Sequence, residues 1–256
     1  MFASTYCLQL SSAIREVFAN ISNILLSDDS WCQAGLPVRW GGIGVRDVLS
    51  LASSAFLGSL HASAPLVEAL LPPSTAPSPL SKQMESAFRN WLSLRGSTPP
   101  QGSDACSQRA WDDLICRAAF DNLIARANQV SRARLLASSF PSSGAWLNAL
   151  PCRNLGLALS DREFRVAVGL RLGVSLVRPH TCGCGANIDP LAYHDLSCRL
   201  SAGRQRRHAQ ANDVLARAIR ACDVHAELEP THLFSNGGKR PDGATLVAWS
   251  RGRCLV

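Results

Sequence analysis

The sequence contains no uninterrupted apolar run close to the roughly 20 residues that a membrane-spanning helix requires. Its N-terminus also lacks the basic start and long apolar core that are typical of a signal peptide. Both absences favour an intracellular protein of the nucleus or cytoplasm without a membrane partner. The 10 cysteines fit this view, because a chain of 256 residues with helical patterning does not need a disulfide framework. We therefore expect a reducing compartment.

The composition permits a sizeable core and favours an anionic partner. With 256 residues, 46% of them hydrophobic, the chain can hold one large domain or two small ones. It carries 26 Lys and Arg against 19 Asp and Glu, a formal net charge of +7, which makes DNA or RNA the first candidate partner. Charge alone is weak support, since many basic proteins have no nucleic-acid partner.

The first 179 residues mostly show the spacing of amphipathic helices. Ile14, Val17 and Phe18 begin an apolar stripe on one face of a first helix. Ser160 and Glu163 match a capping box, in which each side chain accepts from the backbone amide of the other. The first helix is expected to end near 27–30, and a second is expected to start at the N-cap Asp47. Two more are expected over 84–92 and 111–127. The helix that follows Ser160 is expected to point Arg162, Arg165 and Arg171 outward.

Stretches rich in glycine, proline and serine interrupt these helices. The stretch 41–44 lacks the Lys-Ser/Thr of a P-loop, so we interpret it as a tight turn rather than a phosphate site. Trp31 and Trp40 are its expected packing partners. The stretches 71–79 and 96–103 are expected to be linkers.

Four potential metal ligands lie close together after residue 180. Cys182, Cys184, His194 and Cys198 form a C-x-C-x9-H-x3-C pattern, the number and kind of ligands that a tetrahedral structural zinc site needs. Glycines after each of the first two cysteines allow the backbone to curl around one ion. The alternative is a loop with reduced thiols, because C-x-C is less usual in zinc modules than C-x2-C.

A basic segment follows the cysteines. Residues 204–222 have the pattern of a helix, and its first turns carry Arg204, Arg206, Arg207 and His208. Cations at a helix N-terminus oppose the helix dipole, and a nucleic-acid phosphate would compensate for them. The alternative is an exposed helix start that water and salt screen.

The last residues favour short strands. Residues 224–229 alternate as a strand does, Asn236 to Gly238 predict a turn, and residues 244–249 form the next expected strand. A further strand is expected to begin at 254–256.

The order of these motifs resembles the C-terminal region of non-LTR retrotransposon reverse transcriptase polyproteins. In that family a CCHC zinc knuckle precedes a basic helix, an Arg-Pro-Asp motif and a restriction-like endonuclease of the PD-(D/E)xK kind. Here Arg240-Pro-Asp242 supplies that motif. Residues 26–46 are similar to the segment that follows the palm of such polymerases, and the resemblance spans roughly 8–60 and 145–256.

The resemblance also implies site residues. Asp242 matches the first catalytic acid, which holds Mg²⁺ in an intact enzyme, and Glu227 or Glu229 could assist it. Lys239 and Arg240 join the expected nucleic-acid contacts. No counterpart of the second essential acid is present, and Mg²⁺ needs more than one carboxylate. Without the resemblance, Asp242 would be interpreted as an ordinary turn residue.

We therefore expect an α+β fold that is mostly α-helical, with a structural Zn²⁺ and an incomplete endonuclease-like end. The expected function is that of a nucleic-acid-binding part of a retroelement polyprotein, without catalytic activity by itself. The alternative is a zinc-stabilised helical adaptor that binds protein, and nothing in the sequence indicates an oligomeric state. The expected divisions are a thumb-like helical segment at 1–70, linkers with one helix at 71–104, a helical connector at 105–179, the zinc knuckle at 180–200 and the truncated endonuclease-like segment at 201–256.

Overall fold

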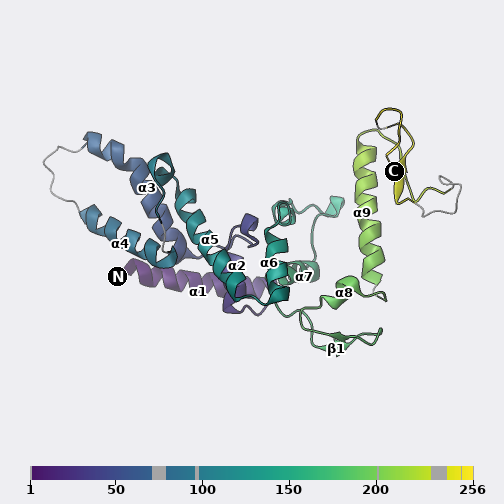
Figure 1. The fold of residues 1–256 in the computed structure, drawn as a ribbon, viewed down its shortest axis with the longest axis horizontal. Helices are drawn as coiled ribbons and strands as arrows, with labels where there is room; N and C mark the ends of the chain where they lie inside the picture. Colours follow the sequence, from purple (N-terminus) through teal and green to yellow (C-terminus); the bar gives the residue numbers. More distant parts are fainter. Residues whose placement is uncertain are drawn as a thin grey trace. The chain divides into compact units, whose positions relative to one another are not determined.

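The structure is a computed structural model that describes residues 2–70, 79–95, 98–200, 202–231, 241–248 and 250–255. These residues form two compact units, one ending at Leu176 and the other starting at Val177. The described part is mostly helical with two small antiparallel sheets, as expected (Figure 1). None of the helices in the described ranges is long and apolar enough to cross a membrane.

The described residues of the N-terminal unit are mostly helical. Its α-helices are α1 (Phe2–Ser22), α2 (Asp28–Gly35), α3 (Val48–Leu70), α4 (Pro79–Arg95), α5 (Gln108–Arg126), α6 (Gln129–Ser139) and α7 (Asp161–Leu172). Short 3-10 helices lie between them: η1 (Val38–Trp40), η2 (Gly102–Cys106), η3 (Ala145–Asn148) and η4 (Arg153–Leu155).

The expected helix starts are confirmed. Asp47 Oδ2 accepts from the amide of Ser50 at 3.0 Å, just before α3. At the start of α7, the Ser160 amide donates to Glu163 Oε2 at 2.8 Å and the Glu163 amide donates to Ser160 Oγ at 3.4 Å. The linker expected at 71–79 lies outside the described residues except for Pro79, which begins α4.

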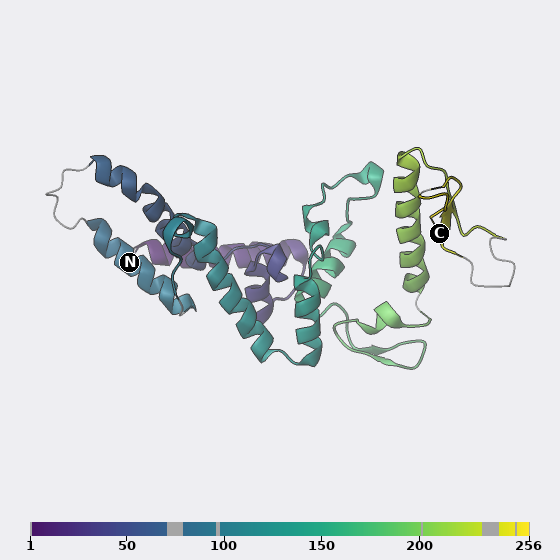
Figure 2. The same cartoon turned by 45° about the horizontal axis from the view of Figure 1, so that its top comes forward.

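Helices α3, α4 and α5 pack together (Figures 1 and 2). Two tryptophans, Trp91 and Trp111, belong to the core between them. The ring centroids of Trp91 and Trp111 are 4.9 Å apart in an edge-to-face arrangement, and both side chains are buried. Trp91 Nε1 donates to the carbonyl of Trp111 at 3.1 Å, and Trp111 Nε1 donates to that of Ala105 at 2.7 Å. Because each indole N–H has a partner, both rings can be buried without leaving an unsatisfied donor.

The arginines of α7 do not all point outward. Arg162 is exposed, as expected. Arg165 donates to the carbonyl oxygens of Asn23 at 3.0 Å and Leu176 at 3.3 Å. Arg171 is only 7% exposed, so the expectation of an outward side chain was wrong for this residue. Its helix face meets irregular backbone whose carbonyl groups need donors.

A buried polar network around Arg171 joins α2, the glycine turn and α7. Arg171 Nε donates to the carbonyl of Gly42 and one terminal nitrogen to that of Val38, both at 2.9 Å. Gln33 Nε2 donates to the carbonyls of Gly41 and Arg171, again at 2.9 Å. Buried carbonyl groups outside regular structure are costly unless they are paired, and these two side chains pair them.

The glycine turn is a packing element, as expected. Gly41 directly follows η1, and its backbone is left-handed with a φ of 81°. The ring of Trp40 lies 5.6 Å from that of Phe120, and Ile43 packs with Trp31 against the core near α7.

The described residues of the C-terminal unit form two antiparallel pairs of short strands and two helices. In chain order these are β1 (His180–Thr181), β2 (Asn187–Ile188), α8 (His194–Ser197), α9 (Ala202–Ala221), β3 (Ala226–Leu228) and β4 (Gly243–Thr245). β1 pairs with β2, and β3 pairs with β4 so that Glu227 lies opposite Ala244. α9 packs against β3 and contacts α8.

The last strands are shorter than the sequence indicates. β3 stops before Glu229, whose φ of 47° is left-handed, and Pro230 follows. β4 stops at Thr245, whose hydroxyl donates to the carbonyl of Val247 at 2.9 Å and bends the chain. In the described part of the strand expected from 254, the Thr245 amide donates to the carbonyl of Leu255 at 2.9 Å and the Leu255 amide donates to Thr245 Oγ1 at 3.0 Å.

Candidate metal centre

The hairpin formed by β1 and β2 holds the first two cysteines in its turn. The Cys182 amide donates to the carbonyl of Ala186, and the Gly185 amide donates to that of Cys182, both at 2.8 Å. Gly185 has a φ of 88°, a conformation that glycine adopts without strain. Gly183 has no such requirement and has open space around its α-carbon. Only one of the two glycines is therefore needed for the curl.

Helix α8 supplies the other two candidate ligands. His194 is its first residue, and Cys198 follows its last residue with an amide that donates to the carbonyl of His194 at 2.8 Å. Cys198 is buried, whereas the other three side chains are half-buried. Sixteen residues separate Cys182 from Cys198 in sequence, and the hairpin and α8 bring their sulfur atoms to 3.7 Å.

The four ligand atoms have the separations of a tetrahedral site. All lie within 4.8 Å of one another. A zinc–sulfur bond of about 2.3 Å places two sulfurs of a tetrahedron about 3.8 Å apart, and a sulfur and an imidazole nitrogen about 3.6 Å apart. The Cys182 and Cys198 sulfurs are 3.7 Å apart, and Cys184 Sγ is 3.3 Å from His194 Nε2. The predicted cluster therefore fits a metal such as zinc.

The electrostatics of Cys184 favour the form that binds metal. The pKa of its thiol is lowered from 9.0 to about 7, chiefly by a backbone hydrogen bond from Ala186. Hydrogen bonds with the other three site residues lower this pKa further, while burial opposes them. A thiolate is the form that coordinates metal ions. With three sulfurs and one imidazole, such a site leaves no ligand position open, which is typical of structural zinc.

The structure describes the side chains of three residues of the predicted basic cluster, Arg206, Arg207 and His208, and all three are exposed. Arg207 donates to the carbonyl of Leu196 at 2.6 Å and so ties the start of α9 to α8. The side chain of Arg204 and the residues Lys239 and Arg240 lie outside the described part of the structure.

The fourth member, His208, meets the predicted catalytic acid. Its Nε2 is 3.1 Å from Asp242 Oδ2, and its Nδ1 is 3.3 Å from the side-chain nitrogen of Asn212. These residues are 34 positions apart in sequence, and no spacing rule in the sequence predicts their contact. Asp242 lies just before β4, and its carbonyl accepts from the amide of Glu229 at 3.1 Å.

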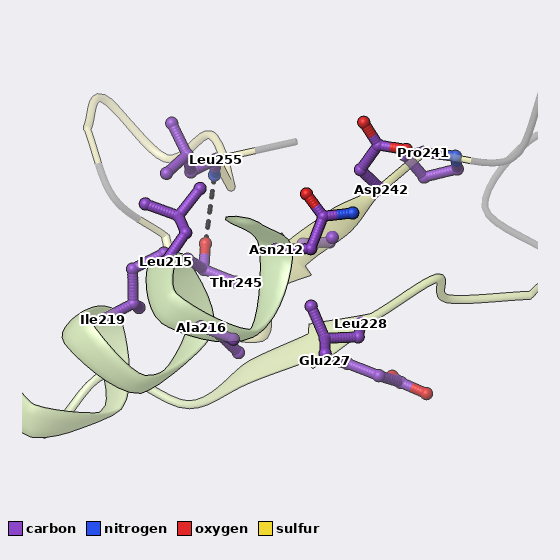
Figure 3. A pocket seen from close by; sticks show the side chains of 13 residues that line it. Asn212, Leu215, Ala216, Ile219, Glu227, Leu228, Pro241, Asp242, Thr245 and Leu255 are labelled. Carbon is purple, nitrogen blue, oxygen red and sulfur yellow. Dashed lines mark hydrogen bonds between the residues drawn. The ribbon is translucent and has the colours of Figure 1, made fainter. Parts of the chain in front are cut away.

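The predicted acids are not gathered into a metal site. Figure 3 shows the side chains of Glu227 and Asp242 pointing in opposite directions. Among the described residues, the cysteines and histidine of the hairpin and α8 are the only group of three or more His, Cys, Asp or Glu whose ligand atoms converge. Asp242 instead lies at the edge of a cavity.

That cavity lies between α9 and the β3–β4 pair, with a volume of about 540 Å³ (Figure 3). Its lining is largely apolar, with Leu215 and Ile219 from α9 and Leu228 from β3. Asn212 and Asp242 supply polar groups at one end. The sequence pattern predicted the helix α9 but not the cavity.

Comparison of the chain with protein-family models gives no match, and comparison with curated proteins gives none either. No family is thereby assigned. The function rests on the chemistry of the site, together with the motif resemblance.

Proposed function

We propose that the chain is a zinc-stabilised, nucleic-acid-binding part of a retroelement reverse transcriptase and endonuclease polyprotein. The observation that carries the proposal is the convergence of Cys182, Cys184, His194 and Cys198 directly before the basic helix α9. The order of a knuckle, a basic helix and a strand preceded by Pro241-Asp242 is also the order of motifs in that family. The thumb-like role of residues 1–70 is part of the same proposal.

Zinc bound by the four residues would neutralise the thiolates and fix the hairpin against α8. The rest of the chain then positions cations for an anionic partner. Residues 177–256 contain 11 Lys and Arg against 7 Asp and Glu, a net charge of +4. Arg206 is exposed on the first turns of α9, where a phosphate would interact favourably with the guanidinium and with the helix N-terminus. Arg204, Lys239 and Arg240 are proposed to add to this contact.

DNA cleavage is proposed to need more acidic metal ligands than this chain supplies. Asp242 would hold Mg²⁺ in an intact parent, with Glu227 or Glu229 assisting. A single carboxylate is too little for an ion that prefers several oxygen ligands. The neighbour of Asp242 is His208, whose Nε2 lies 3.1 Å from Asp242 Oδ2, and imidazole suits zinc better than Mg²⁺. We therefore propose that the chain by itself does not cut DNA.

A second candidate function is that of a zinc-stabilised adaptor for protein partners. Exposed aliphatic side chains favour it, among them Val214 and Leu215 of α9 and Leu246 and Val247 after β4. An apolar protein interface would bury these side chains, whereas a phosphate backbone would not.

Salt dependence of DNA binding tests the proposal. The zinc-loaded full chain should bind a fluorescently labelled DNA duplex, with log affinity falling linearly as log KCl concentration rises. Arg206→Gln should reduce that slope by about 0.9, the value for one lost phosphate contact. Arg217→Gln is the matched control, because Arg217 lies on the same helix but pairs with Asp213 at 3.0 Å. Binding that does not depend on salt, or equal slopes for both variants, would contradict the proposal and favour the adaptor.

A further inference from the structure

The sulfur atoms of the candidate metal centre are not equivalent. Cys182 Sγ and Cys198 Sγ are 3.7 Å apart across the contact between the hairpin and α8. Cys184 Sγ faces His194 Nε2 at 3.3 Å and accepts a backbone hydrogen bond from Ala186. A disulfide bond is about 2.05 Å long, so the first pair needs only a modest approach to become bonded.

Exposure also distinguishes the three thiols. Cys182 and Cys184 are half-buried, while Cys198 is 4% exposed. A small oxidant therefore meets the thiols of the hairpin turn first. Cys198 then lies within reach as an internal second thiol, the arrangement that is typical of a resolving cysteine.

The turn disfavours the pairing of its own two cysteines. Cys182 and Cys184 are separated by one residue, and two hydrogen bonds of 2.8 Å fix the backbone of this turn. A bond between them would have to distort the turn, whereas a bond to Cys198 links two separate elements that already touch. Thiol–disulfide exchange allows the cluster to settle on the less strained pair.

We propose that Cys182 and Cys198 form a reversible disulfide when a peroxide oxidises the metal centre, and that this bond releases the zinc ion. The inference rests on the proposed zinc binding. In the zinc-loaded centre, coordination would hold Cys182 as a thiolate. Its sulfur attacks one peroxide oxygen to give a sulfenic acid, and the departing hydroxide takes a proton from solvent to become water. The Cys198 thiolate then displaces the second hydroxide, which also becomes water, as the S–S bond forms. Peroxide gains the two electrons that the two sulfurs lose.

Oxidation removes two of the four ligands. Cys184 and His194 alone do not supply the four ligands of a structural zinc site, so the ion leaves. The new bond keeps the hairpin joined to α8, and the Cys184 thiol becomes free to react. A thiol reductant and added zinc should restore the original centre.

Peptide mapping after peroxide treatment tests the pairing. Zinc-loaded full chain is treated with hydrogen peroxide in the presence of a chromogenic zinc chelator, alkylated, and digested with a protease that cleaves before aspartate. Cleavage at Asp189 and Asp195 separates the peptide that carries Cys182 and Cys184 from the peptide that carries Cys198. Fragmentation at Gly183 then shows which of the two turn cysteines is alkylated.

We expect bound zinc to fall from about one equivalent to near zero as the two peptides become linked, with Cys184 alkylated. Cys222→Ser, which changes an exposed thiol outside the centre, should behave like the wild type. Cys198→Ser should give no linked peptides. In the metal-free chain, Cys184→Ser should still form the Cys182–Cys198 bond, because it keeps the proposed pair.

Two results would overturn the inference. One is a linked product in which Cys184 rather than Cys182 is bonded, or an unlinked product with a bond inside the turn. The other is complete zinc release without any disulfide. A wild-type chain that never carries zinc would instead contradict the proposed function, and mapping of the metal-free chain would still decide the pairing.

Discussion

Replacing Arg171 by methionine removes a buried guanidinium that donates to three backbone carbonyl oxygens, those of Gly42, Val38 and Ser143. Two of these hydrogen bonds are 2.9 Å long, and the third is 3.4 Å. A hydrogen bond to a charged group contributes roughly 1.5–3 kcal/mol, and a buried group left without its partner carries the full desolvation cost.

An opposing contribution limits the loss. Burial lowers the pKa of Arg171, which means that burying this charge is itself unfavourable, and methionine avoids that cost while filling most of the space. Losing the two short hydrogen bonds outweighs the gain from no longer burying a charge. We therefore expect Arg171→Met to lower the free energy of unfolding by about 2–4 kcal/mol.

Chemical denaturation followed by tryptophan fluorescence measures this loss. Five of the chain's 6 tryptophans precede Val177, so the signal reports mainly on the N-terminal unit. Arg162→Met is the matched control, since Arg162 is exposed on the same helix and should cost less than about 0.5 kcal/mol. Equal stability of the two variants would show that the carbonyls find other donors and would refute this reasoning.

Three further changes have distinct expected outcomes. Gly42→Ala should prevent stable folding of the N-terminal unit, because the new Cβ would overlap backbone carbonyl atoms at the end of α2; circular dichroism melting checks this. Gly183→Ala should keep zinc binding while Gly185→Ala weakens it, because only Gly185 has a positive φ; zinc titration with a competing chelator compares them. Ser160→Ala removes the hydroxyl that bonds Glu163 Oε2 but keeps the backbone amide bond, which is the larger cause of the lowered Glu163 pKa. This pKa should therefore rise only part of the way to its usual value, and the pH-dependent part of the stability deficit should be present at neutral pH and shrink as pH falls below 4.5, as denaturation at several pH values would show.

The features that the sequence predicted well are those set by near neighbours. The capping box of Ser160 and Glu163 spans three residues, and the metal ligands lie within one short segment whose spacing already limits their geometry. The position of the first helix likewise follows from the period of its apolar residues, although Val17 of the expected stripe is 55% exposed. The residues that determine each of these features lie close together in sequence.

The features that it did not predict join distant segments. Arg171 was expected to point outward from α7 into solvent. Its side chain instead donates a hydrogen bond to the carbonyl of Gly42, which is 129 positions away in sequence. The contact of His208 with Asp242 crosses from α9 to the start of β4 and has no local signature. A lone sequence does not indicate which distant carbonyl a long side chain will reach.

Zinc content is the most direct test of the central claim that the hairpin and α8 form a metal centre. Native mass spectrometry of the full chain, purified in reducing buffer without chelator, counts the bound ions. We expect about one Zn²⁺ per wild-type chain and a loss of that ion in Cys184→Ser, whose remaining three ligands leave the tetrahedron incomplete. A folded wild-type chain that carries no zinc, even after zinc is added, would contradict the presence of a metal centre.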